Sequence, residues 1–399
     1  MTHPLAGIRI VDLSTVLSGP LATALLADQG ADVIKVESPE GDTARRVGPA
    51  KGEQSAMFIT ANRGKRLIAL DLKAPQARPV LHALIDRADV LVENFRPGVM
   101  ARLGLDDALL AERWPALIRL SITGFGHDGP RAGDKAYDAV IQAVSGFSAS
   151  HPVRTTGEPD LLPTLVCDKL TALTAAQAVT AALLARTRDG KGRRVQVSML
   201  DAALAFQWPD AMYKHVFADG SPPDFPEIGA TTRPWRTADG HVATMTPQQA
   251  EFKAVCAALG RPDIGEDPRF ATSASRMKHG PELRALLEPL MAARRTAELE
   301  ADARALHAPL GAVLTRQQVL DDPQVRHNHS VVILDDPVTG PLRLARSAAL
   351  FDGVPQAPRG GSGAIGADGP ALLRELGLGD DEIQALASAG VLHLPPAAG

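Results

Sequence analysis

Short apolar runs that alternate with helix-like segments constrain the fold of this 399-residue chain most strongly. GIRIVDL at 7–13 is expected to form a strand, 21–30 a helix, and DVIKVE at 32–37 a second strand. Two strands joined through a helix pair in parallel with a right-handed crossover. Further strands are expected at 67–72, 89–95 and 117–126. The pattern therefore predicts an α/β fold with a large domain built on a parallel, Rossmann-like sheet.

The carboxyl ends of parallel strands are where such sheets bind ligands. The Ser-Gly-Pro turn at 18–20 follows the first strand, although a plain connection would look the same. It does not match G-x-G-x-x-G, so a dinucleotide is not indicated. Basic residues recur near the expected strand ends and could bind a polyphosphate or form a solvated face: Arg63, Lys65, Arg66, Lys73, Arg96 and Arg102. Both interpretations stay open on the sequence alone.

Composition shifts along the chain predict a second domain. A Pro-, Asp- and Gly-rich stretch at 209–234 is interpreted as a linker after a first part at 1–208. A hairpin and several helices at 235–325 predict a smaller α+β domain, and 326–399 is expected to return and complete the large one. Within the return segment, the Gly/Pro-rich residues 353–369 are interpreted as an extended crossing segment.

Bulk properties exclude several classes of protein. The net charge is −4, so no nucleic-acid partner is expected. No apolar run approaches the roughly 18 residues of a membrane span, and the first residues lack the pattern of a signal peptide. The two cysteines, Cys167 and Cys256, do not make a disulfide framework. We therefore expect a cytoplasmic protein without a membrane partner.

Asp168 stands at the start of the longest helical segment, KLTALTAAQAVTAALLAR, which contains neither Gly nor Pro. An aspartate there is first interpreted as an N-cap, ionised at neutral pH. A carboxylate can also attack an activated acyl group and carry it covalently. The neighbouring Cys167 is expected to be a small buried residue rather than a nucleophile.

Several stretches together resemble the family III CoA-transferases, which include carnitine and formyl CoA-transferases and α-methylacyl-CoA racemases. They are LAGIRIVDLS…SGP, GADVIKVESPEGD, NRGKRLIALDLK, ADVLVENFRPGVMARLGL, LIRLSITGFG, KAYD and LVCDKLTAL…GKGRRVQVSMLDA. The resemblance implies an acyl-CoA donor and a small carboxylic acid as substrates, with no permanently bound cofactor and no metal. It also implies a homodimer of the interlocked family type, in which each chain threads through the other.

The resemblance assigns roles residue by residue. Asp168 matches the catalytic aspartate that takes the acyl group and then forms an aspartyl-CoA intermediate. The positions that match CoA-binding residues are Leu17, Ser18, Leu70, Asp71, Leu72, Lys73, Asn94, Phe95, Arg96, Arg102, Lys135, Ala136, Tyr137 and Asp138.

Two departures from the formyl-type pattern argue against a formyl or oxalate specificity. Ser38 stands where those enzymes carry an arginine after the second strand, and the glycine-rich loop that closes over the intermediate is absent from 220–245. We expect a succinyl-CoA-like donor with dicarboxylic acids as the first acceptors to consider.

A racemase or epimerase and a non-catalytic CoA-binding protein are the alternatives. Racemisation needs two acid/base groups on opposite faces of Cα, and relatives use a histidine and an aspartate. Tyr137 stands at the histidine position. A tyrosine hydroxyl has an ordinary pKa of about 10 and accepts protons poorly at neutral pH. This substitution favours CoA transfer.

Overall fold

The computed structural model describes residues 3–150, 153, 156–220 and 233–395. The chain forms two compact units, one from residues 1–207 with 326–399 and the other from 208–325. Each unit has its own hydrophobic core.

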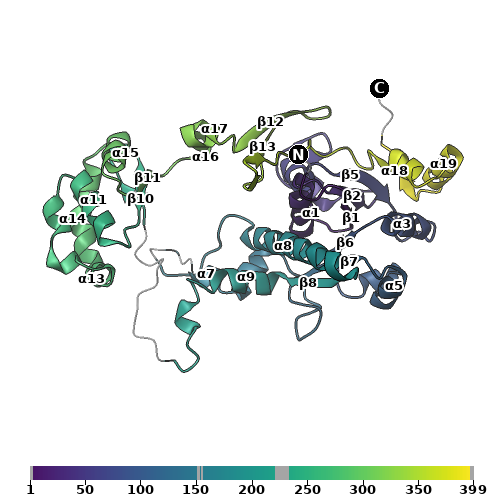
Figure 1. Cartoon of the computed structure of the whole chain (residues 1–399), viewed down its shortest axis with the longest axis horizontal. Coiled ribbons are helices and arrows are strands. Elements are labelled where there is room, and N and C mark those ends of the chain that lie inside the picture. The colour runs from purple at the N-terminus through teal and green to yellow at the C-terminus, as the bar shows by residue number, and fades with distance from the viewer. Residues whose placement is uncertain (1–2, 151–152, 154–155, 221–232, 396–399) are drawn as a thin grey trace. The chain divides into compact units, whose positions relative to one another are not determined.

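A seven-stranded sheet forms the centre of the first unit in the described part of the chain (Figure 1). Its order is β16-β5-β2-β1-β6-β7-β8, and every pairing is parallel except the one between β16 and β5. The strands are β1 (Arg9–Asp12), β2 (Asp32–Glu37), β5 (Arg66–Leu70), β6 (Val90–Glu93), β7 (Ile118–Thr123), β8 (Arg194–Ser198) and β16 (Leu392–His393). The predicted α/β class with a large parallel sheet is confirmed. The antiparallel edge strand β16 was not predicted, because two residues carry no period.

Alternate residues of the strands enter two separate cores, as the pleat requires. Ile10 belongs to one core and its neighbour Val11 to the other. The first core is completed by helices α1 (Ser18–Asp28), α6 (Asp138–Val144), α8 (Val166–Asp189) and α9 (Met199–Gln207). The second is completed by α3 (Ala77–Asp86), α5 (Asp107–Arg113), α18 (Gly369–Glu375) and α19 (Asp380–Ser388). Helices thus cover both faces of the sheet (Figure 1).

Helix α8 is long because its 24 residues contain no Gly or Pro, and it ends where Gly190 adopts φ 71°. Its buried face consists mainly of alanine and other small residues and packs against α1. Small side chains permit a close approach of the two helices. This packing fixes the start of α8 next to the start of α1.

The other elements of the first unit are short. They are η1 (Thr43–Arg46), β3 (Ala50–Lys51), β4 (Gln54–Ser55), α2 (Ala56–Asn62), α4 (Val99–Arg102), α7 (Phe147–Ser150), β12 (Val331–Asp336), β13 (Gly340–Ala345), β14 (Leu350–Phe351) and β15 (Val354–Pro355). The stretch 40–56 between β2 and α2 contains a 3-10 turn and a small hairpin. These short elements have no hydrophobic period in the sequence and are stabilised by local hydrogen bonds. Asp42 accepts from the backbone of Ala44, and Ser55 caps α2.

The second unit packs helices around one core and a small sheet. Strands β9 (Trp235–Arg236), β10 (His241–Thr244) and β11 (Leu310–Ala312) pair antiparallel. The helices are η2 (Tyr213–His215), α11 (Gln249–Ala258), α12 (Pro262–Gly265), η3 (Pro268–Phe270), α13 (Ser273–Lys278), α14 (Gly280–Ala292), α15 (Thr296–Ala305), α16 (Arg316–Asp321) and α17 (Pro323–His327), which ends just beyond the unit boundary. The expected hairpin is present, but β11 joins it from a stretch predicted as helical. Much of the expected linker, 221–232, lies outside the described residues.

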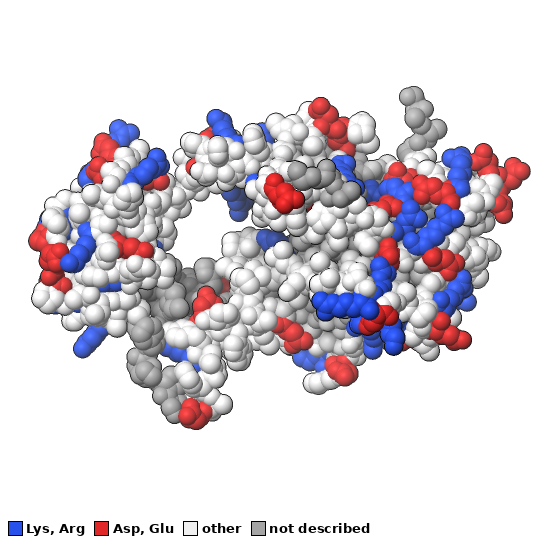
Figure 2. Space-filling model, viewed as in Figure 1, with Lys and Arg blue, Asp and Glu red and all other residues white. Residues whose placement is uncertain are grey.

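Charged side chains of both signs occur on the surface. Lysine, arginine, aspartate and glutamate are interspersed over the face shown in Figure 2. Among the described residues, no helix combines the length and apolar character needed to cross a bilayer.

Strand order reverses between β1 and β6. From β1 the chain builds outward through β2 and β5, then returns to the other side of β1 and continues through β6, β7 and β8. Such a switch point leaves a crevice at the carboxyl ends of the two central strands, where α/β sheets bind ligands.

Candidate active site

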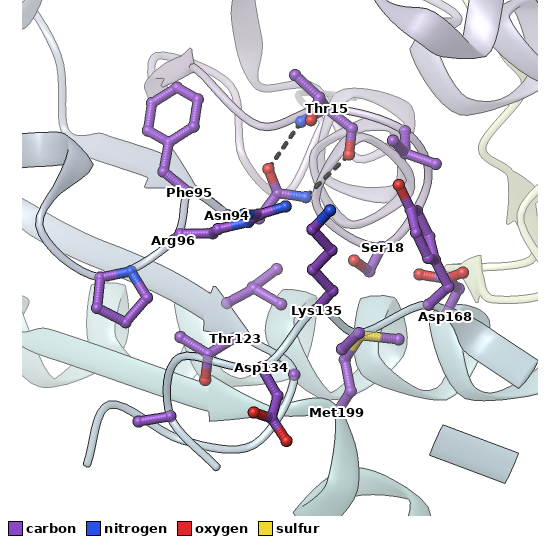
Figure 3. A pocket seen from close by; sticks show the side chains of 17 residues that line it. Thr15, Ser18, Asn94, Phe95, Arg96, Thr123, Asp134, Lys135, Asp168 and Met199 are labelled. Carbon is purple, nitrogen blue, oxygen red and sulfur yellow. Dashed lines mark hydrogen bonds between the residues drawn. The ribbon is translucent and has the colours of Figure 1, made fainter. Parts of the chain in front are cut away.

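A cavity of about 240 Å³ lies at this switch point. Its walls come from the segments that follow β1, β6, β7 and β8, together with the start of α8. The lining residues are Thr15, Val16, Ser18, Asn94, Phe95, Arg96, Pro97, Ile122, Thr123, Gly124, Ala132, Asp134, Lys135, Ala136, Tyr137, Asp168 and Met199. In Figure 3, Arg96 extends from the left and Lys135 from below toward the same space, and Ser18 and Asp168 lie to the right of Lys135.

Asp168 is the third residue of α8, not its N-cap. Leu165 precedes the helix and caps it with no side-chain hydrogen bond. The N-cap interpretation is therefore wrong, and the reason is that the helix begins two residues before the aspartate. The side chain of Asp168 instead lies on the cavity wall.

Asp138 supplies the cap that Asp168 does not. Its carboxylate accepts a hydrogen bond from the backbone N–H of Asp168 at 2.9 Å and another from Gln142 at 2.6 Å. Gln142 in turn accepts from the backbone N–H of Leu162 at 2.9 Å, in the segment that leads into α8. Asp138 is only 2% exposed and does not line the cavity. Its predicted contact with CoA remains a prediction, while the structure places it underneath the nucleophile candidate.

The surroundings of Asp168 favour its neutral form more than water would. Burial and the negative charge of Asp138 raise its pKa from 3.8 to about 6, although the hydroxyl and backbone N–H of Ser18 hydrogen-bond the carboxylate and oppose the shift. Asp168 is thus still mainly ionised at neutral pH, as expected, but it is more basic than an ordinary aspartate. A carboxylate that is partly desolvated and basic is a better nucleophile than one in water.

Two close approaches bring the walls together. A Cβ on Gly19 would lie 2.3 Å from the Cβ of Ser14, and one on Gly124 would lie 2.2 Å from the Cβ of Ala136. Only glycine fits at either position. Asn94 then ties the β6 end to the β1 end, because its side chain bonds the N–H and the carbonyl of Thr15, both at 2.8 Å.

The structure brings together eight of the residues predicted for the site. Asp168, Ser18, Asn94, Phe95, Arg96, Lys135, Ala136 and Tyr137 line the cavity. The others lie outside its lining: Leu17, Leu70, Asp71, Leu72, Lys73, Arg102 and Asp138. Leu70 is 0% exposed and belongs to the core beside β5, so its side chain is not free to contact a ligand. Lys73 follows β5 and Arg102 ends α4, and both are exposed.

Three of the six basic residues considered for a polyphosphate are engaged elsewhere. Arg63 pairs with Asp28 at 2.6 Å, and Lys65 is buried against Asp12 at 3.0 Å. Arg66 starts β5, at the amino end of the sheet, and pairs with Asp32 and Glu375. For these three residues the structure argues against a polyphosphate site, because carboxylates of the same chain already neutralise their positive charge.

Several cavity residues were missed in the sequence. They are Thr15, Val16, Pro97, Ile122, Thr123, Gly124, Ala132, Asp134 and Met199. Thr15, Gly124 and Met199 directly follow or flank strands, so the carboxyl-end rule could have found them once the strand order was known. Cys167 is 0% exposed, which confirms the prediction of a small buried residue, and burial raises the pKa of its thiol to about 12.

These features define an α/β protein of the switch-point class, whose ligand cavity presents a basic carboxylate at a helix start opposite exposed cations. The sequence model of CoA-transferase family III matches residues 5–369. The chain belongs to this family. It is an acyl-CoA:carboxylate CoA-transferase, and it acts on CoA thioesters.

Named relatives agree over most of the chain. A probable fatty acyl-CoA transferase of Mycobacterium tuberculosis is 35% identical over 82% of this chain and 86% of its own length. The succinate–glutarate CoA-transferase of Agrobacterium fabrum is 36% identical over 81% and 83%. The formyl-CoA:oxalate CoA-transferase of Streptomyces avermitilis is 32% identical over 98% and 100%.

Solved structures show the same fold. A CAIB/BAIF family protein from Brucella suis superposes with a TM-score of 0.81 at 32% identity, covering 94% of this chain and all of the other. These comparisons support CoA transfer and do not favour the racemase alternative.

Proposed function

We propose that the chain moves CoA from a succinyl-CoA-like donor to a small carboxylic acid through a covalent aspartyl-CoA intermediate on Asp168. The observation that carries the proposal is a basic, partly buried carboxylate on the wall of a cavity at the switch point. Dicarboxylic acids are the first acceptors to consider, in line with the named succinate–glutarate relative. The site needs no resident cofactor for this chemistry.

The reaction would proceed by exchange at carbonyl carbons. An Asp168 oxygen attacks the donor thioester, the C–S bond breaks, and a mixed anhydride and CoA thiolate form. The thiolate attacks the Asp168 carbonyl carbon, which releases the donor acid and leaves an Asp168–CoA thioester. The acceptor carboxylate displaces the thiolate, and the returning thiolate takes the acceptor acyl group and frees Asp168. No proton or water is consumed, so the free carboxylate of Asp168 must be ionised when it attacks the donor.

Charge placement supports the binding of CoA at the open side of the cavity. Arg96 and Lys135 are exposed cavity-lining cations, and neither forms an ion pair with any described residue. Lys73 follows β5, and Arg102 ends α4, which follows β6, so both come after the carboxyl ends of parallel strands. Phosphate oxygens are bound most strongly by such charge-assisted hydrogen bonds. We assign the four cations to the CoA phosphates and the pocket near Asp168 to the acyl group.

The proposed working form is an interlocked homodimer of the large domain 1–208 with 326–399, the linker 209–234 and the small domain 235–325. Exposed apolar side chains on the first unit support a protein partner: Leu173 and Leu184 of α8 and Phe206 of α9 are each more than half exposed. Both cysteines are free and buried, which suits a cytoplasmic location.

Racemisation is the second candidate function. It needs two acid/base groups, and Asp168 is one group that could move a proton at Cα. Tyr137 stands at the position of the second acid/base group and is 68% exposed. Deuterium exchange at Cα of an acyl-CoA without an acceptor acid would support racemisation against the transfer mechanism.

Covalent trapping tests the proposal. The enzyme is mixed with succinyl-CoA, quenched with hydroxylamine or borohydride, digested and analysed by mass spectrometry. The expected result is a donor-dependent mass change on the peptide that contains Asp168. D134N is the matched control, since Asp134 also lines the cavity but is exposed and pairs with Arg131 at 2.9 Å; it should label normally. Absence of any adduct on Asp168 would exclude the covalent route.

A further inference from the structure

The turn between β1 and α1 holds an unusual backbone conformation. Val16 has φ 70°, the left-handed region that a β-branched residue rarely adopts. Thr15 and Val16 form part of the cavity wall, and Ser18 follows them at the start of α1. Strain of this kind persists only where neighbouring groups impose it, and it is typical of functional sites.

Asp42 is the group that holds Val16. Its two carboxylate oxygens accept hydrogen bonds from the backbone N–H of Val16 at 3.1 and 3.2 Å. The Nζ of Lys35 lies 3.0 Å from Asp42 and also donates to the carbonyl of Ser14. This ion pair therefore forms hydrogen bonds with the backbone of the turn at Val16 and at Ser14.

This ion pair is wholly buried, with both side chains at 0% exposure. Burial alone would raise the pKa of Asp42, but the charge of Lys35 and the N–H groups of Ala44 and Val16 lower it below its usual value, so the carboxylate stays charged. A buried ion pair is often no more stable than an apolar pair of the same size. Lys35 interrupts an otherwise apolar stretch of β2. The stability of the fold gives little reason for a charged residue at this position.

We propose that Lys35 and Asp42 are positioning residues that hold the Val16 turn in the conformation that binds the acyl-CoA substrate. The proposal rests on the proposed function for the identity of the ligand. Neither residue lines the cavity; both act through the backbone of Ser14 and Val16. Without them, the valine would relax to an ordinary φ and the cavity wall would move.

A glycine at position 16 gives a direct test, because glycine adopts positive φ without steric cost. The affinity for CoA is measured by calorimetry, and the KM for succinyl-CoA by kinetics, for D42N and for K35M/D42L. The second variant removes both charges and leaves no unpaired buried charge, so it guards against simple unfolding. Each variant is made with and without V16G.

We expect D42N and K35M/D42L to weaken CoA binding and to raise KM at least tenfold, with a smaller change in kcat. In the V16G background the same changes should cost less than threefold. R63M/D28L is the matched control: it removes another buried ion pair, 2.6 Å long, that does not contact the turn. It should leave the CoA affinity within twofold in both backgrounds.

Equal losses with and without V16G would overturn the proposal, as would a loss of affinity in R63M/D28L as large as in K35M/D42L. The two proposals fail separately. If the wild type binds CoA but transfers nothing, the transfer function falls while the affinity comparison still decides the role of Lys35 and Asp42. If the wild type does not bind CoA, the positioning role falls as well.

Discussion

Charged residues lie at both ends of the parallel strands, the amino end and the carboxyl end, here called the amino edge and the carboxyl edge. They differ in whether a carboxylate of the chain neutralises the cations. At the amino edge the charges are neutralised: Arg66 pairs with Asp32 and Glu375, and Arg186 at the end of α8 pairs with Asp89 at 2.7 Å. At the carboxyl edge Arg96 and Lys135 are exposed, and Asp168 has a raised pKa. The difference teaches that a cation near a strand end indicates a ligand only when no carboxylate of the chain has already neutralised it.

The largest expected effect is that of replacing Asp168 at the carboxyl edge. D168N removes the nucleophile while keeping the shape of the side chain, so kcat for CoA transfer should fall about a thousandfold or more. Steady-state kinetics with succinyl-CoA and a panel of small acids measures the loss, and D134N serves as the control within the same cavity. A kcat for D168N within tenfold of the wild type would show that the carboxyl edge is not the reacting edge.

Cations at the two edges should respond differently to removal. R96A and K135A each take away a charged hydrogen-bond donor for the CoA phosphates, a contact worth about 1.5–3 kcal/mol, so the KM for acyl-CoA should rise about 10- to 100-fold. R66A should leave KM unchanged, because Arg66 is bound to Asp32 and Glu375 at the far edge. An increase in KM for R66A equal to that for R96A would contradict the proposed division.

Asp138 should set the pH range of the reaction. With the pKa of Asp168 at about 6, kcat/KM should fall as the pH drops below about 6, because only the ionised carboxylate attacks. D138N removes the charge that helps raise this pKa and keeps one of the two acceptor oxygens, so the acidic limb should move to lower pH. D138N leaves the other charged or titratable groups around Asp168 in place. These groups are Lys135, Tyr137, Cys167 and Lys169. A pH profile of D138N identical to that of the wild type would show that the charge of Asp138 does not act on Asp168.

The sequence predicted most of the large sheet but only part of the site, and particular residues show why. The central strands, such as β1 with Ile10 and Val11, are short apolar runs between helical segments. The fold class of the large domain could therefore be predicted from this pattern. The role of Asp138 could not be predicted, since it depends on where α6 places one carboxylate relative to the start of α8. The ion pair of Arg66 with Asp32 could not be predicted either, because it depends on the pairing of β5 with β2.

The smallest expected effects are on stability, and they should have opposite signs at the two edges. The folded-state pKa of Asp168 is raised above its ordinary value, so ionisation of Asp168 costs stability, and the cost is fully present above about pH 6. D168N should therefore raise Tm at pH 7.5 by about 1–3 °C, and the gain should shrink as the pH falls toward 4. R66A should lower Tm by about 1–3 °C, since it breaks two partly exposed ion pairs of modest strength. Differential scanning calorimetry at both pH values distinguishes the cases: if D168N lowers Tm at pH 7.5, Asp168 is part of the stabilising charge network, and the contrast between the edges does not hold.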